Sequence, residues 1–222
     1  MKKIILSIII LFVFSYPAIS HIEHYADYNY LEYELFRNNK FIGKHIYKFK
    51  RNNGNLTVNS EVSFQIKKFN IILYKYYAQS QELYKNGKFF KFIANTLQNK
   101  KEKYVKINVD STKKQLLIDG SSYKGPTSLD SIVGTWWNHE IVKAKAQISA
   151  VSGRIIEQKV TFLGKETVKI NGKSYEALHF NFSSSDENLP DNKKLNTDIW
   201  YDEKTKLWIK ASFDKTGFGN ID

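Results

Sequence analysis

The residues with the greatest potential for chemistry lie together in one irregular stretch, Trp136-Trp137-Asn138-His139-Glu140. Two indole rings can contact an apolar ligand, and an amide or an imidazole beside them can orient the polar end of that ligand. Burying large aromatic side chains is also the commoner way to fill the concave face of a sheet. The sequence leaves both interpretations open, and Trp136, Trp137, Asn138 and His139 are candidate ligand-binding residues.

His139 is the residue of this stretch that could transfer protons. Neighbouring side chains point to opposite sides of a strand and lie about 100° apart on a helix, so Glu140 is not expected to pair with it directly. The sequence has no cysteine and no nucleotide-binding or nucleophile-elbow motif. We therefore expect no catalytic residues, no metal and no cofactor, and an enzyme that uses His139 is kept only as an alternative.

A second aromatic set lies earlier in the chain. Alternation places Tyr74 and Tyr76 on one face of a strand with Ile72, whereas Ile71 and Leu73 fall on the other face. A strand with two apolar faces is either covered on both sides or lines a cavity with one of them. Tyr74 and Tyr76 are therefore also candidate ligand-binding residues, with burial in an ordinary core as the alternative.

The elements that must position these residues are strands. From Leu56 to Ile66 apolar and polar residues alternate without a break, which is typical of a strand with one buried face. Asn86-Gly87 and Asn171-Gly172 are tight-turn signals, and such signals recur about every ten residues. We predict a mainly β domain: a single curved antiparallel sheet, or half barrel, of about ten to eleven strands. A short helix or loop plug would lie on its concave side.

The predicted domain organisation has one export signal and one folded unit. Residues 1–20 combine two lysines, an apolar run and small residues before His21, which predicts a secretory signal peptide cleaved near Ser20. The apolar run is shorter than the roughly 20 residues needed to span a bilayer. A single β-rich domain would then fill 21–222 as an N-terminal meander, a plug and C-terminal strands (28–119, 120–144 and 145–215). Within the plug, Ser128 would cap a short helix over 129–137.

The formal net charge of +12 raises the question of an anionic partner. Of 34 basic residues only Arg37, Arg51 and Arg154 are arginines, and the lysines are scattered along the chain. Recognition of nucleic acid relies on the planar guanidinium group, so we expect no nucleic-acid partner. A solvated lysine surface is the main interpretation, and contact with an anionic membrane surface remains the alternative.

Four segments, taken in order, resemble an uncharacterised family of secreted bacterial β-proteins of unknown function. They are Ile42-Gly43-Lys44-His45, the meander around 56–96, Trp136-Trp137-Asn138, and Asp198-Ile199-Trp200-Tyr201-Asp202. That family is in turn similar to the lipoprotein-carrier half barrels of the LolA and LolB type, in which a curved antiparallel sheet wraps around a helix and leaves an apolar groove. The resemblance implies a fold and a compartment but no catalytic residues.

Together these observations predict a non-enzymatic periplasmic or secreted protein that binds or carries a lipophilic small molecule or lipid in an apolar groove. An envelope protein-interaction module, which pairs through an exposed strand edge, is a second hypothesis. A small-molecule enzyme that uses His139 is the third. A monomer is favoured, and the sequence does not identify the ligand.

Overall fold

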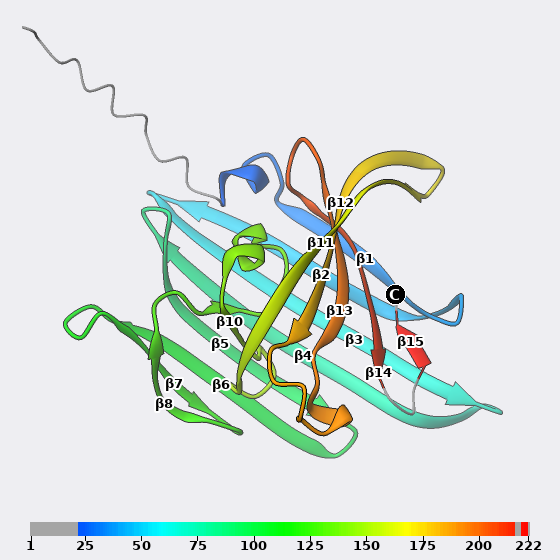
Figure 1. Cartoon of the computed structure of the whole chain (residues 1–222), viewed down its shortest axis with the longest axis horizontal. Coiled ribbons are helices and arrows are strands. Elements are labelled where there is room, and N and C mark those ends of the chain that lie inside the picture. The colour runs from blue at the N-terminus through cyan, green and yellow to red at the C-terminus, as the bar shows by residue number, and fades with distance from the viewer. Residues whose placement is uncertain (1–21, 216–218, 222) are drawn as a thin grey trace, which may run out of the picture.

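The computed structural model describes residues 22–215 and 219–221, so the predicted signal peptide lies outside the described residues. Most of the described chain is β-structure (Figure 1). Its fifteen strands are β1 (Tyr30–Arg37), β2 (Lys40–Asn52), β3 (Asn55–Lys68), β4 (Ile71–Lys85), β5 (Lys88–Gln98), β6 (Lys101–Asp110), β7 (Gln115–Gly120), β8 (Lys124–Ser128), β9 (Ile132–Val133), β10 (Ala146–Ile148), β11 (Ile155–Ile170), β12 (Lys173–Ser184), β13 (Asn196–Asp202), β14 (Trp208–Lys215) and β15 (Gly219–Ile221).

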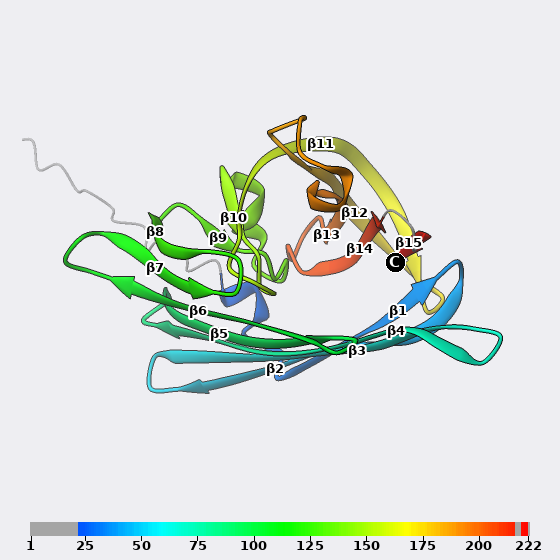
Figure 2. The same ribbon diagram turned by 90° about the horizontal axis from the view of Figure 1, so that it is seen from below.

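The strands follow the order β8-β7-β6-β5-β4-β3-β2-β1-β15-β14-β13-β12-β11-β10-β9, and all described pairings are antiparallel except β9 with β10. Strands β1 to β8 form a long N-terminal layer, and strands β9 to β14 lie across it as a second layer (Figure 2). The two layers are joined where β15 pairs with both β1 and β14. Side chains from the N-terminal part of the chain therefore face side chains from its C-terminal part across the interior.

The prediction of a mainly β, antiparallel domain is confirmed, but its half-barrel form is not. The long strands β2 to β6 form an extended layer with little curl, and β-strands rather than a helix cover it (Figure 2). The number of described strands is larger than predicted, partly because the segment predicted as a plug contributes β8 and β9 to the sheet. Residues 219–221, which lie beyond the predicted C-terminal strands, form β15.

The predicted short helix over 129–137 is wrong. That segment holds a turn and the two-residue strand β9, and the nearest helix is the short 3-10 helix η2 (His139–Lys143), which Asn138 caps. The other helices described are also single 3-10 turns, η1 (Glu23–Tyr25) and η3 (Asp191–Lys193). No helix in the described part of the chain is long and apolar enough to cross a bilayer.

The turn predictions are confirmed by the backbone. At Asn86-Gly87 φ is 47° and 75°, and at Asn171-Gly172 it is 50° and 77°. Two consecutive positive φ values characterise the tight turn whose twist matches that of antiparallel strands. These turns fix the register of β4 with β5 and of β11 with β12, and the register decides which side chains face the interior.

The alternation predicted for Leu56 to Ile66 is also confirmed. Leu56, Val58 and Ile66 are buried on the interior face of β3. The interior holds two clusters of buried side chains. One surrounds Trp137 between the layers, and the other lies where β5 to β7 pack against β9 and β10.

Candidate ligand-binding cavity

A cavity of about 700 Å³ lies between the two layers. Strands β1 to β5 line one side of it, the loop 134–136 and residues 147–151 close part of it, and β11 and β14 line the other side. Its lining surface is more apolar than polar, although polar residues contribute as well, Glu32 and Glu34 among them. Its size falls within the range of about 300–1,000 Å³ that is usual for small-molecule sites.

Small side chains on neighbouring strands explain why this part of the interior is hollow. Ser60 on β3 is opposite Ser80 on β4, and Ser80 is opposite Ala94 on β5. In the next row Val62 is opposite Ala78. All five line the cavity. Because paired positions share one face of a sheet, these residues leave a shallow floor that the opposite layer does not fill.

Larger side chains bound this floor along the same strands. On one side Val58 is opposite Glu82, and Glu82 is opposite Phe92. On the other side Phe64 is opposite Tyr76, and their rings stack with centroids 5.0 Å apart. The cavity is therefore a gap between two well-packed rows on the same face.

Tyr74 and Tyr76, predicted from the sequence, both line the cavity. Burial raises the pKa of Tyr76 to about 12, so its hydroxyl is neutral in the physiological range. Ile71 and Leu73, expected on a second covered face, are exposed instead. Only the interior face of β4 is therefore part of the candidate site.

Trp136 also lines the cavity, and its backbone is held in an unusual conformation. Its φ is 62°, in the left-handed region that bulky residues rarely adopt. The Trp137 amide donates to the Thr135 carbonyl at 2.8 Å, which makes Trp136 the centre of a γ-turn. Such strain persists only where the surrounding structure enforces it, and it is concentrated at functional sites.

Two tyrosine hydroxyls enforce this turn from opposite layers. The Tyr47 hydroxyl on β2 donates to the Thr135 carbonyl at 2.6 Å, and the Tyr201 hydroxyl on β13 donates to the Trp136 carbonyl at 2.8 Å. The Trp136 indole Nε1 is buried and has no hydrogen-bond acceptor among the described residues. A buried donor without an acceptor destabilises the folded state. A ligand that supplies an acceptor to this N–H would therefore gain binding free energy.

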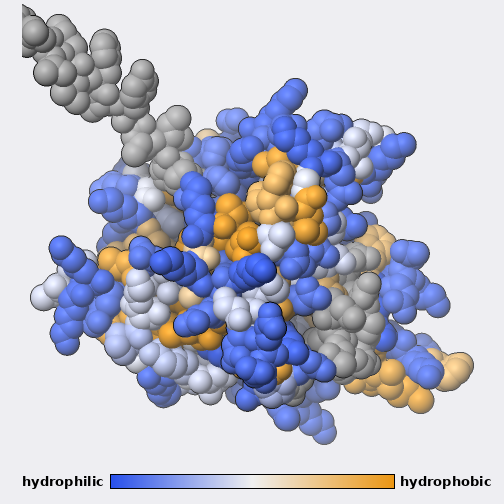
Figure 3. Space-filling view, in the orientation of Figure 1, coloured by the Kyte–Doolittle hydropathy of each residue, from blue (hydrophilic) through white to orange (hydrophobic). Residues whose placement is uncertain are grey.

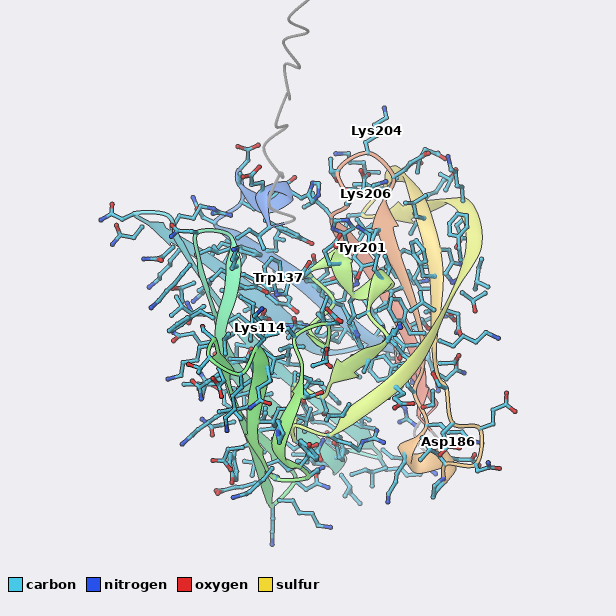
Figure 4. All side chains as sticks on the ribbon, turned by 60° about the vertical axis from the view of Figure 1, so that its left-hand side comes forward. Lys114, Trp137, Asp186, Tyr201, Lys204 and Lys206 are labelled. Carbon is cyan, nitrogen blue, oxygen red and sulfur yellow. The ribbon has the colours of Figure 1, made fainter. Side chains whose placement is uncertain are left out.

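Trp137 has a different position from its neighbour. It is fully buried, does not line the cavity, and contacts the rings of Tyr25, Phe49 and Tyr84 at centroid distances of 5.4–5.7 Å. Figure 4 shows Trp137 within the interior, to the left of Tyr201. The structure therefore assigns Trp137 to the packed core.

Glu82 explains how the Trp137 indole is satisfied in that core. Its carboxylate accepts from Trp137 Nε1 at 2.9 Å and from the Tyr84 hydroxyl at 2.9 Å. Burial raises the pKa of Glu82, although these donors oppose the shift. A carboxyl group is thus fixed between the packed core and the cavity floor.

Asn138 and His139 lie outside the cavity lining. The Asn138 side chain accepts from the Glu140 amide at 3.2 Å and so caps η2. The His139 ring lies 5.0 Å from the His24 ring and 6.3 Å from the Tyr201 ring. The expectation that His139 would not pair with Glu140 is wrong, because His139 Nε2 lies 3.5 Å from a Glu140 carboxylate oxygen.

The main polar pair inside the cavity was not predicted. His45 Nε2 on β2 lies 2.8 Å from the Ser60 hydroxyl on β3, and both residues line the cavity. Burial lowers the pKa of His45 to about 3. A base of this strength is poorly matched to proton transfer near neutral pH, so the pair is suited to hydrogen bonding with a ligand.

Sequence reasoning missed this pair because His45 and Ser60 are 15 residues apart. The usable signal is register. The Asn53-Gly54 turn places Tyr47 opposite Ser60 and His45 opposite Val62, which makes His45 a diagonal neighbour of Ser60. Glu82 gave a weaker signal: a charged residue at an interior position of an alternating strand.

Residues 33–222 match the family described as Domain of unknown function (DUF6134). The chain belongs to this family. Membership agrees with the predicted resemblance to an uncharacterised family, and the mainly β structure agrees with its β-protein character. No curated protein and no solved structure matches the chain, so the predicted similarity to lipoprotein-carrier half barrels is not supported.

Proposed function

We propose that this DUF6134 protein binds one lipophilic small molecule or lipid in the cavity between its layers, as a binding or carrier protein. The observation that carries the proposal is the preformed cavity of about 700 Å³, whose lining surface is more apolar than polar. Sites of this composition are the usual ones for apolar ligands. Tyr74, Tyr76 and Trp136 would contact the ligand, whereas Trp137, Asn138 and His139 would support the surrounding fold.

The polar groups suggest the class of ligand. The polar groups held away from solvent in the lining are neutral, and they include the part-buried His45–Ser60 pair, the buried Gln147 amide and the Trp136 N–H. Two lysines contribute to the lining, but Lys169 is exposed, and the Lys210 ammonium lies 4.6 Å from the centroid of the Trp200 ring. Because a desolvated carboxylate would lack a buried cation, we propose a ligand with an uncharged polar end, such as an ester or alcohol.

An enzyme based on His139 has less support. The His139 ring packs against His24 and Tyr201, and the residue does not contribute to the cavity lining. A ligand in the cavity would therefore not meet the imidazole.

The test combines extraction with probe binding. The purified protein is extracted with organic solvent and the extract is analysed by mass spectrometry. The protein is then titrated with a fluorescent acyl-chain probe as the free acid and as the methyl ester. We expect a copurified lipid and tighter binding of the ester. Absence of both a copurified lipid and probe uptake would refute the proposal.

A matched pair of substitutions locates the binding. Ser80→Phe fills the cavity floor from the interior face of β4, whereas Ser63→Phe adds the same ring to the exposed face of β3. We expect Ser80→Phe to reduce probe affinity on the order of tenfold or more, because the ring occupies the ligand volume, and Ser63→Phe to leave it unchanged. Equal effects of the two variants would place the probe elsewhere.

A further inference from the structure

The hairpin that joins β3 to β4 ends in a run of exposed apolar side chains. Phe69 is 88% exposed, Ile71 is 65% exposed, and Ile72 and Leu73 are each 51% exposed. The hairpin extends beyond the rest of the N-terminal layer in two perpendicular views (Figures 1 and 2), and an apolar patch lies at the same place in the space-filling view (Figure 3). Single exposed apolar residues are common on protein surfaces, whereas a contiguous exposed apolar patch marks an interaction surface.

Local backbone geometry presents this run to solvent. Phe69 and Asn70 have φ values of 48° and 62°, which form a tight turn with a phenyl ring at its apex. The register then shifts so that Ile66 is opposite Tyr74 but Lys67 is opposite Ile72, which leaves Leu73 as a bulge. A bulge bends its strand. It separates Tyr74, which faces the cavity, from the exposed residues before it.

The surroundings of the run are basic. Within the β3–β4 tip, defined as residues 67–75, Lys67, Lys68 and Lys75 are exposed and there is no acidic residue. The neighbouring β5–β6 turn is attached to the tip, because the Asn99 amide donates to the Lys75 carbonyl at 2.7 Å and the Lys75 amide donates to the Asn99 side chain at 2.8 Å. That turn adds Lys100 and Lys101, which are also exposed.

We infer that the β3–β4 tip docks on the surface of a bilayer that contains anionic phospholipid. An aromatic and aliphatic apex can enter the boundary between headgroups and acyl chains, while lysines behind it meet the phosphates. Charge complementarity favours this occupant over a second copy of the chain, which would bring the same lysines together.

Docking would also orient the cavity. The strands of the tip continue directly into the cavity lining at Ile66, Tyr74 and Tyr76. If the proposed function holds, the bound tip places that end of the cavity nearest the bilayer. Docking itself does not depend on a ligand, so it can succeed or fail independently of the proposed function.

The absence of cysteine allows the first test. An environment-sensitive fluorophore is attached to Ile72→Cys in the full chain, and a control fluorophore to Lys88→Cys at the opposite end of the layer. With vesicles of phosphatidylglycerol and phosphatidylcholine, we expect a blue shift at position 72, none at position 88, and reversal by salt. No shift at 72, or equal shifts at both positions, overturns the inference, and the site-specific signal is independent of residues 1–21.

Matched variants provide the second test, by cosedimentation with the same vesicles. Phe69→Ser is compared with Phe90→Ser, because Phe90 is also exposed and also has a lysine near its ring, Lys85 at 3.6 Å. We expect a loss on the order of tenfold in vesicle partitioning for Phe69→Ser and none for Phe90→Ser, with unchanged unfolding curves. Equal partitioning of both variants overturns the inference. So does dimerisation of the wild type that Phe69→Ser abolishes, if it occurs without vesicle binding.

Discussion

Two neighbouring regions of the interior face of β3 and β4, which we call the packed end around Trp137 and the hollow end at the cavity floor, differ in the size of their side chains. At the packed end, Leu56, Val58 and Tyr84 surround Trp137. At the hollow end, Ser60, Ala78 and Ser80 occupy equivalent inward positions and leave the cavity. Strand pairing continues through both ends. The difference shows that the cavity is specified by side-chain volume on an otherwise regular sheet.

Each end also holds one carboxyl or imidazole group with a shifted pKa. Glu82 at the packed end has a raised pKa, and His45 at the hollow end has a pKa lowered to about 3. Desolvation is the leading cause of both shifts, and it favours the neutral form of each group. The two ends should therefore respond to pH in opposite directions, which makes the comparison measurable.

The largest effect is expected from Trp137→Ala. This substitution removes a fully buried indole from three ring contacts and leaves Glu82 without one of its donors. We expect the free energy of unfolding to fall by about 3–5 kcal/mol, the usual cost of such a truncation in a core. Denaturation with urea, followed by tryptophan fluorescence and circular dichroism, measures it.

Trp136→Ala is the matched control for that measurement, because the adjacent indole borders the cavity and is only partly buried. We expect it to cost about 1–2 kcal/mol, because less apolar surface is lost and the cavity already exists. If Trp136→Ala destabilised the protein as much as Trp137→Ala, the distinction between a packed end and a hollow end would be wrong.

The next effect concerns acid stability and His45. Its pKa in the folded state, about 3, lies below the ordinary value of 6.5, so the unfolded chain binds the proton first. The contribution of this group is complete above pH 6.5 and is lost as pH falls toward 3, by up to about 1.4 kcal/mol per pH unit. His45→Gln should remove this dependence. As pH falls below 6.5 the wild type loses this contribution and the variant does not, so the variant should become more stable relative to wild type.

That difference is measured by urea unfolding at several pH values. His179→Gln is the control for removing a histidine outside the cavity. His179 does not line the cavity, and its Nδ1 lies 3.0 Å from a Glu166 carboxylate oxygen. The difference in unfolding free energy between His45→Gln and wild type could instead stay constant between pH 6.5 and 4. That result would show that water in the cavity solvates the imidazolium well enough to keep the pKa of His45 near its ordinary value.

Glu82→Gln tests the packed end with the opposite sign. The pKa of Glu82 is raised above its ordinary value of 4.5, so the folded state binds the proton more tightly than the unfolded state. Wild-type stability from this group is complete below pH 4.5 and declines as pH rises through the folded pKa. We expect Glu82→Gln to match wild type near pH 4 and to exceed it at neutral pH. A variant less stable at every pH would mean that the charged carboxylate is the better acceptor for Trp137.

The sequence predicts most of the strands and buried residues of the packed end, but it does not predict the cavity at the hollow end. Alternation from Leu56 to Ile66 and the Asn-Gly turns identified strands and register correctly, because both signals are local in the chain. The cavity depends on Ser60, Ser80 and Ala94 being side by side on three strands. Small residues at single positions give no such signal until the pairing is known.

The same limit explains the tryptophan pair. Sequence reasoning treated Trp136 and Trp137 alike, because residue type and neighbourhood are nearly the same. Their separation is decided by the positive φ of Trp136, which depends on hydroxyl groups from Tyr47 and Tyr201, 88 and 65 residues away from their acceptors. The helix predicted over 129–137 failed for a related reason: tertiary pairing of β9 with β10 overrides the local capping signal at Ser128.

The smallest effect is expected from filling the hollow without reaching its far wall. Ala78→Leu adds apolar volume on the cavity floor, between Val62 on β3 and Thr96 on β5. Filling a cavity of this kind usually increases stability by about 0.5–2 kcal/mol. Ala94→Leu is the control: Ala94 is buried against the second cluster, so the same change there should overpack and destabilise. Opposite signs for the two substitutions in thermal unfolding would show that Ala94, which also lines the cavity, forms its packed edge on β5, whereas destabilisation by both would mean that the floor is already packed at Ala78.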